Sequence, residues 1–200
     1  MSSSKVTPWA EGPDTTDSVD EVPTSLVGQL LVSRPDLHDP NFDGTITLLL
    51  EHNEAGALGI ILNRPSDLDV DDPFPGWSGV ATEPAVIFAG GPVERDGLIA
   101  LGRGPEAGEL PLGLHSVDLE AQPELVAASG VQEVRIFAGY AGWGTGQLEG
   151  EMASGAWWAV EAHVDDVFFA EPERLWPTVL RRTGGELRWF AHFPSDVSLN

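Results

Sequence analysis

The sequence GYAGWGTGQLE fills residues 139–149, and four of its eleven residues are glycines. The apolar run before it, residues 134–138, predicts a strand. Residues 146–153 predict a helix with Leu148 and Met152 on one face. Glycine lets the backbone adopt a positive φ or approach a neighbour closely, while Tyr140 and Trp143 combine a broad apolar face with a polar group. We expect a rigid surface feature in which the glycines serve tight packing and a turn into the helix.

Length and composition limit the class of protein. A chain of 200 residues suits one domain that buries about 70% of its unfolded surface. No apolar run approaches the roughly 20 residues that cross a bilayer, and the start, MSSSK, lacks the regions of a signal peptide. The chain has no cysteine, which removes disulfides and thiolate chemistry. We expect a cytoplasmic protein with no membrane contact.

The charge is strongly unbalanced, with 32 Asp and Glu against 10 Lys and Arg and a formal net charge of −22. DNA-binding proteins gain affinity from basic side chains that displace phosphate counterions, and this sequence predicts no basic face on the folded protein. The pair Arg181-Arg182 precedes two glycines and is interpreted as cations at a helix C-terminus. We therefore expect no direct nucleic-acid binding, whereas a protein partner with a basic surface would be attracted.

The chain divides into two parts. Residues 1–25 are polar and acidic, with three prolines, and predict a disordered tail; residues 26–200 predict one folded domain. Strands are expected at residues 28–32, 45–51, 59–63, 85–89, 97–101, 114–117 and 134–138, with a hairpin between the second and third. Helices are expected at residues 122–128, 146–153, 164–170 and 172–182, the last interrupted at Pro177. Paired strands followed by grouped helices favour the α+β class: a single domain of largely antiparallel sheet with a few helices packed on it.

Several short motifs lie in the strand-rich part. They are Asp39-Pro40-Asn41-Phe42, Glu51-His52-Asn53, Asn63-Arg64-Pro65 and Gly90-Gly91-Pro92-Val93. Together with residues 139–149, they make the sequence resemble the AlgH/YqgE family (UPF0301, DUF179). That resemblance implies a single α+β domain of coiled, bifurcated sheets. It implies no settled activity, since the family's transcriptional-regulator label is an inference from phenotype. Many members have a cysteine where this chain has Leu50, so no role that needs this thiol applies here.

The polar motif residues allow two interpretations. Asp39 or Glu51 with His52 could supply a general base and its partner, as in a hydrolase or isomerase, or two ligands for a divalent ion. Asp39 and Asn41 are equally typical of side chains that bond their own loop backbone. A metal would need further ligands, for which His38 and His163 have no defined place. We favour the structural interpretation and expect neither metal nor cofactor.

The cation of one motif and the aromatic side chains also have two interpretations. Arg64 could hold a carboxylate or a phosphate, or could pair with Asp67 or Asp69, which the excess of acids favours. Tyr140 and Trp143 could line a groove for a small molecule or peptide, beside Gln147 and Glu149, or could be core residues. Trp157 and Trp158 would point to opposite faces of a strand, so that one could reach the surface. Trp176, Trp189, Phe190 and Phe193 are expected to close the core.

The favoured hypothesis is a binding or regulatory module, acting through a protein partner or a small ligand, with enzyme catalysis as the alternative. Oligomeric state stays open, with a monomer slightly favoured. The candidate binding residues are Asp39, Asn41, Phe42, His52, Asn63, Arg64, Tyr140, Trp143, Gln147 and Glu149. This hypothesis assumes that the fold brings them into one groove.

Overall fold

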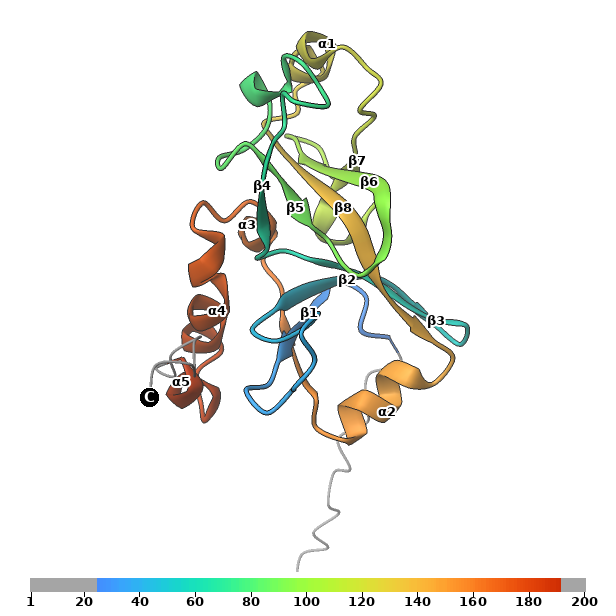
Figure 1. The fold of residues 1–200 in the computed structure, drawn as a ribbon, viewed down its shortest axis with the longest axis vertical. Coiled ribbons are helices and arrows are strands. Elements are labelled where there is room, and N and C mark those ends of the chain that lie inside the picture. The colour runs from blue at the N-terminus through green and yellow to red at the C-terminus, as the bar shows by residue number, and fades with distance from the viewer. Residues whose placement is uncertain (1–24, 192–200) are drawn as a thin grey trace, which may run out of the picture.

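The computed structural model describes residues 25–191, so the predicted acidic tail, except Ser25, lies outside the described residues, as does Phe193. Nine strands form one mixed sheet (Figure 1): β1 Gln29–Ser33, β2 Ile46–Asn53, β3 Gly56–Ile61, β4 Pro65–Asp69, β5 Val86–Ala89, β6 Val93–Arg103, β7 His115–Ser116, β8 Glu133–Gly144 and β9 Trp157–Glu161. Five α-helices lie among the described residues: α1 Pro123–Ala128, α2 Gln147–Ala153, α3 Val164–Val167, α4 Leu175–Thr183 and α5 Leu187–Phe190. Three-residue 3-10 turns are η1 Trp77–Gly79, η2 Pro111–Gly113 and η3 Pro172–Arg174. This confirms the α+β class.

Strand β8 joins the two halves of the sheet. The strand order is β4-β5-β8-β3-β2-β1-β9, with β6 pairing both β8 and β7. The first part of β8 pairs in parallel with β5 and antiparallel with β6, and its second part pairs antiparallel with β3. Figure 1 shows β8 running from the upper half of the molecule into the lower half. All the other pairings between the described strands are antiparallel.

Two glycine segments touch where β8 passes from one half to the other. A Cβ atom built on Gly91 would stand 2.0 Å from the carbonyl carbon of Tyr140, and one on Gly90 would stand 2.4 Å from the carbonyl oxygen of Gly139. Gly139 itself has φ +70°, a left-handed conformation that favours glycine. Backbone therefore packs directly on backbone here, which confirms the tight packing expected of residues 139–149.

The sheet is apolar on both faces in its lower half. Successive residues of a strand point to opposite faces: Leu30 joins the core cluster beneath α4, and Leu31 joins the cluster beneath α2. Helix α4 covers its cluster with Leu175, Trp176, Val179 and Leu180, an amphipathic spacing. A third cluster, around Trp77 and Ile136, fills the upper half. Burial on both faces explains the continuous apolar runs of β1 and β2.

Arg135 is a cation within this core, with 1% of its surface exposed. Its guanidinium donates to the carbonyl oxygens of Val167, Phe169 and Glu83, and lies 4.4 Å from the ring centroid of Phe88. Burial lowers the pKa of Arg135 to about 10, with Glu133 opposing that shift. Arg135 thus ties the sheet to the segment after α3 through charge-assisted hydrogen bonds to carbonyl groups.

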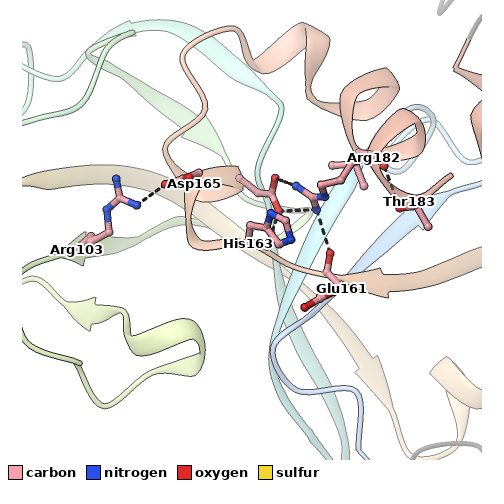
Figure 2. Close-up of polar contacts among 8 residues, drawn as sticks. Arg103, Glu161, His163, Asp165, Arg182 and Thr183 are labelled. Carbon is pink, nitrogen blue, oxygen red and sulfur yellow. Dashed lines mark hydrogen bonds and ion pairs between the residues drawn. The ribbon is translucent and has the colours of Figure 1, made fainter.

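A second arginine joins helices α3 and α4 (Figure 2). Arg182, in the last turn of α4, donates to both carboxylate oxygens of Asp166 at 2.6 and 2.9 Å and to the carbonyl oxygen of Glu161 at 3.0 Å. Asp166 is buried and also accepts the backbone N–H of His163, which caps α3. Arg103 on β6 binds Asp165 on the same helix. Arg181 and Arg182 therefore lie at a helix C-terminus, as the sequence predicts.

Most of the predicted elements exist, but their limits differ. The β2–β3 hairpin turns over two residues, whereas the predicted strand limits leave seven, because the strands continue to Asn53 and from Gly56. Strand β8 extends through Gly144, so most of residues 139–149 are strand. The sequence did not predict strands β4 and β9. Trp157 and Trp158 lie on β9 and point to opposite faces of the sheet, as expected for neighbours on a strand. Helix α3 ends at Val167, short of the predicted limit.

The aromatic side chains expected in the core divide into two groups. Trp176 is buried and donates its indole N–H to the carbonyl oxygen of Ser33 at 3.0 Å. Phe190 packs against Trp158, with ring centroids 4.9 Å apart. Trp189 is 65% exposed, so its expected place in the core is wrong, because on the four-residue helix α5 it faces away from the side that Leu187 and Phe190 bury. Among the described helices, none is long and apolar enough to cross a membrane.

The glycine contact predicts a sharp difference between two Gly→Ala variants. Gly91→Ala should lower the free energy of unfolding by more than about 3 kcal/mol, because a methyl group would overlap backbone atoms of β8. Gly150→Ala, in the middle of α2 where a Cβ meets nothing within 4 Å, should raise it by about 0.5–1 kcal/mol. Urea denaturation of both variants tests this. Equal, small effects would contradict the close approach.

The α3–α4 connection gives a second stability prediction. Asp166→Asn should cost about 2–3 kcal/mol, because it removes a bidentate, mostly buried ion pair. Asp165→Asn is the matched control, since it makes the same change one residue away at a carboxylate that is 79% exposed, and should cost less than about 1 kcal/mol. Thermal denaturation at pH 7 measures both. A control as costly as Asp166→Asn would show that burial of the pair is unimportant.

Candidate functional site

The structure distributes the predicted site residues between two regions rather than one groove. Asn41 and Arg64 line a pocket of about 290 Å³ on the face formed by the ends of β3, β5 and β6. His52, Trp143, Gln147 and Glu149 gather around α2 instead. The loop at residues 34–44 reaches both regions, because Asn41 faces the pocket and Phe42 packs with Trp143.

The pocket, here called the arginine pocket, is built from segments far apart in the sequence. Its polar side chains are Asn41, Arg64 and Arg95. The rest of its lining is apolar or glycine: Ile61, Ala89, Gly91, Pro92 and Ala138. Gly91 belongs to the close contact with β8, so the same backbone packing that joins the sheet halves also forms part of the pocket wall.

Local hydrogen bonds fix the loop that carries Asn41. The backbone N–H of Asn41 donates to Asp39 Oδ1 at 2.8 Å, a turn typical of Asp. Asn63 accepts the N–H of Ile46 and donates to the carbonyl oxygen of Gly44, both at 2.8 Å, which closes the loop on β2. Asp39 therefore holds the loop backbone, as the structural interpretation predicts. The same expectation is wrong for the side chain of Asn41, whose Oδ1 contacts Arg95, and Asn63 bonds the loop in its place.

Arg64 follows β3 and is half-buried. Its Nη2 donates to the carbonyl oxygens of Pro40 and Asp43 at 3.2 and 3.1 Å. Desolvation by burial lowers its pKa, an effect that the charges of Asp43 and Asp39 oppose. The expected pairing with Asp67 or Asp69 is wrong, because no carboxylate within the described part of the chain lies within 4 Å of this guanidinium, and β4 carries both acids away on an exposed edge.

Arg95 completes the pocket and was not singled out in the sequence. It lies in a bulge of β6, where the pairing with β8 jumps from Val93–Tyr140 to Leu98–Ala138. Glu94 beside it has φ +47°, an uncommon value for a residue with a side chain. Arg95 Nη2 donates to Asn41 Oδ1 at 3.5 Å, and within residues 25–191 it has no carboxylate partner. The sequence feature that could have identified Arg95 is its position three residues after the motif Gly90-Gly91-Pro92.

His52 has a carboxylate partner, but the partner is Glu149 and not Asp39 or Glu51. His52 Nδ1 accepts the backbone N–H of Leu26 at 3.0 Å, so the ring proton lies on Nε2, which donates to Glu149 Oε1 at 2.9 Å. The side chain of His52 is 7% exposed. This hydrogen bond lowers the pKa of Glu149. Both ring nitrogens are thus occupied by contacts that join β2 to the start of the domain and to α2.

The aromatic side chains of the predicted site around α2 pack against one another. Phe42, Trp143 and Trp157 have ring centroids 5.4–6.0 Å apart. Both indole N–H groups donate to Oε2 of Glu151, at 2.9 and 2.8 Å. The other oxygen of Glu151 accepts from Gln147 Nε2, whose Oε1 accepts the N–H of Gly144. Glu151 was not singled out, although it follows Gln147 by one helical turn.

Two further features complete the description. Tyr140 is half-buried against the core, on the strand that forms part of the pocket. A larger pocket of about 460 Å³ lies at the upper end between β7 and α1, with His115 in its lining. No group of three or more potential metal-ligating side chains occurs within residues 25–191.

The fold and the pocket define a class: an α+β domain in which one long strand joins two sheet halves beside a cationic pocket. Over residues 30–188 the sequence matches the AlgH-like family (DUF179), and the chain belongs to that family. A UPF0301 protein of Streptomyces coelicolor is 51% identical over 187 residues, covering 88% of this chain and 96% of that protein.

Solved structures agree with this assignment. A Corynebacterium diphtheriae protein matches with a TM-score of 0.76 and 29% identity over 84% of this chain and 92% of that one. The AlgH protein of Pseudomonas aeruginosa, also named UPF0301, matches with a TM-score of 0.63 and 34% identity over 86% and 96%. The family resemblance seen in the sequence is confirmed.

The His52 contact predicts how Glu149 titrates. In the intact protein the pKa of Glu149 should lie below its ordinary value of 4.5, and in His52→Ala it should rise toward that value. The stability that this bond contributes is present above pH 4.5 and is lost as the pH falls through the lowered pKa. Carboxyl-detected NMR titration measures the shift. His115→Ala, whose ring contacts Glu106 and Glu109 instead, should leave Glu149 unchanged.

Proposed function

We propose that this AlgH-like protein is a binding module that receives an anionic group in the arginine pocket. The observation that carries this proposal is the pairing state of its two cations. Acids outnumber bases by 32 to 10, yet within the described residues Arg64 and Arg95 line one pocket with no carboxylate within 4 Å. Arg34, Arg103, Arg174 and Arg182, in contrast, are paired with acids. Arg181 and Arg188 have no carboxylate within 4 Å in this part of the chain either, but they are exposed in the last turns of α4 and α5, and Arg135 binds carbonyl groups in the core. Unpaired guanidinium groups beside apolar walls favour a carboxylate or phosphate ligand.

The geometry around His52 argues against the enzyme alternative. A general base needs a nitrogen that can reach a substrate, whereas Nδ1 of His52 accepts from Leu26 and Nε2 donates to Glu149. Asp39 is engaged with its own loop and Glu51 lies on the exposed edge of the hairpin. These contacts support a structural role for His52 and a non-catalytic function.

The acidity of the chain adds a second element to this proposal. Beyond about 8 Å, charges are largely screened at physiological ionic strength, so the net charge of −22 still leaves the arginine pocket open to a small anion. The same charge repels nucleic acid and steers a protein with a basic surface toward this one. A cytoplasmic binding or regulatory module that joins a small anion to such a partner accounts for both features.

NMR titration of the full-length protein with inorganic phosphate and with acetate, at constant ionic strength, tests the pocket. Saturable shifts are expected at the amides of Ala89, Gly91 and Ala138. Arg95→Gln should weaken phosphate binding by about tenfold or more, because it removes a charge-assisted donor. Arg181→Gln, an exposed arginine on α4, is the matched control and should leave binding unchanged.

Absence of saturable shifts with both anions would overturn the proposed function. Arg64→Gln is informative only together with Arg95→Gln, because Arg64 also holds the loop carbonyls of Pro40 and Asp43. Arg95 is exposed, so its substitution tests binding without disturbing the fold.

A further inference from the structure

We propose that the arginine pocket selects a tetrahedral oxyanion attached to a small apolar body, that is, an organic phosphate monoester, over a carboxylate. This inference rests on the proposed function and specifies its ligand class. Three features of the pocket support it: the way Arg64 is already used, the number of separate donors, and the apolar remainder of the lining.

Arg64 cannot offer the bidentate fork that suits a carboxylate. A guanidinium donates to the two oxygens of a carboxylate along one of two edges, formed by Nε with Nη2 or by Nη1 with Nη2. Both edges include Nη2, and Nη2 already donates to the carbonyl oxygens of Pro40 and Asp43. The remaining donors of Arg64, on Nε and Nη1, therefore point in separate directions and serve a ligand one bond at a time.

The other polar groups of the pocket add donors from two further segments. Asn41 uses Oδ1 to accept from Arg95, which leaves its Nδ2 donor without a partner among residues 25–191. Within the same described residues, Arg95 contacts Asn41 through Nη2 alone, so one complete edge of its guanidinium stays open. Donors therefore come from three segments, namely the 34–44 loop, the β3–β4 connection and the bulge of β6. Donors from three directions match the three terminal oxygens of a phosphate monoester better than the two oxygens of a carboxylate, which Arg95 alone would satisfy.

Charge and shape agree with this ligand class. A phosphate monoester carries about −1.5 to −2 at pH 7, which two guanidinium groups balance. No acidic side chain lines the described pocket, although Asp39 and Asp43 lie near enough to act on Arg64 electrostatically. The pocket holds about 290 Å³, and Ile61, Ala89 and Pro92 leave its remainder apolar. The ligand is therefore expected to carry a compact apolar group beside the anion.

The test compares three ligands that share one apolar body. Phenyl phosphate, benzenesulfonate and benzoate are titrated into the full-length protein at pH 7.5 and constant ionic strength, with amide shifts of Ala89, Gly91 and Ala138 as the readout. We expect phenyl phosphate to bind about tenfold more tightly than benzoate, because it offers one more oxygen and more charge. Benzenesulfonate, tetrahedral but singly charged, should fall between them, which separates shape from charge.

The variant Asn41→Ala removes the third donor without adding charge. It should weaken phenyl phosphate binding about five- to tenfold and leave benzoate within about twofold, because two oxygens are satisfied without Asn41. An unchanged spectrum away from the pocket serves as the folding control.

The outcomes separate this inference from the proposed function. Benzoate binding as tightly as phenyl phosphate, or equal losses for both ligands in Asn41→Ala, would overturn the phosphate assignment while the anion-binding function stands. No saturable binding by any of the three ligands would overturn both.

Discussion

The direct contact of the Gly90-Gly91 backbone with Gly139 and Tyr140 is the constraint on which the rest of the structure depends. A side chain at any of the three glycines would separate the strands, since a Cβ there would stand 2.0–2.7 Å from backbone atoms. The contact lets β8 leave its pairing with β5 and β6 and join β3, so that one strand serves both halves of the sheet. It also contributes to the arginine pocket, because Gly91 and Ala138 form part of its wall. Fold and candidate site thus have one physical origin.

Much of the fold follows from the sequence because the signals are local. The runs of β1 and β2 are apolar at consecutive positions, and both faces of their sheet are indeed covered. Helix α4 shows its amphipathic spacing, and its cations lie in the last turn. Strand β4 could not be recognised, because Pro65–Asp69 is an exposed edge that carries two acids and a proline. The length of β8 was hidden by its glycines, which usually weaken a strand but here permit close packing.

Of the residues predicted for the candidate site, Asn41 and Arg64 line the arginine pocket, whereas Arg95 was not predicted and the assembly of the pocket could not be. Spacing along the chain indicates which side chains bond their own loop, as with Asp39, but not which strands become neighbours. The carboxylate beside His52 comes from a helix 97 positions away, and the second cation of the pocket comes from a strand bulge. Both arrangements are set by pairing register, a tertiary property that a single sequence does not display.

The few cations of this acidic chain differ in how many of their donors the fold uses. Arg135 and Arg182 are buried or partly buried and donate several hydrogen bonds to carbonyl and carboxylate oxygens, so they hold the helices against the sheet. Arg64 donates to the loop that carries Asn41 through Nη2 only. Within the described part of the chain, Arg95 makes one hydrogen bond, from its Nη2 to Asn41 Oδ1. The loop is fixed from its other side as well, because Phe42 packs between Trp143 and Trp157. Asn41 is therefore held in place by the fold, so the proposed binding of an anion would cost little conformational entropy of the loop. Contact with this fixed loop distinguishes Arg64 and Arg95 from the exposed arginines Arg181 and Arg188, which also have no carboxylate within 4 Å among residues 25–191.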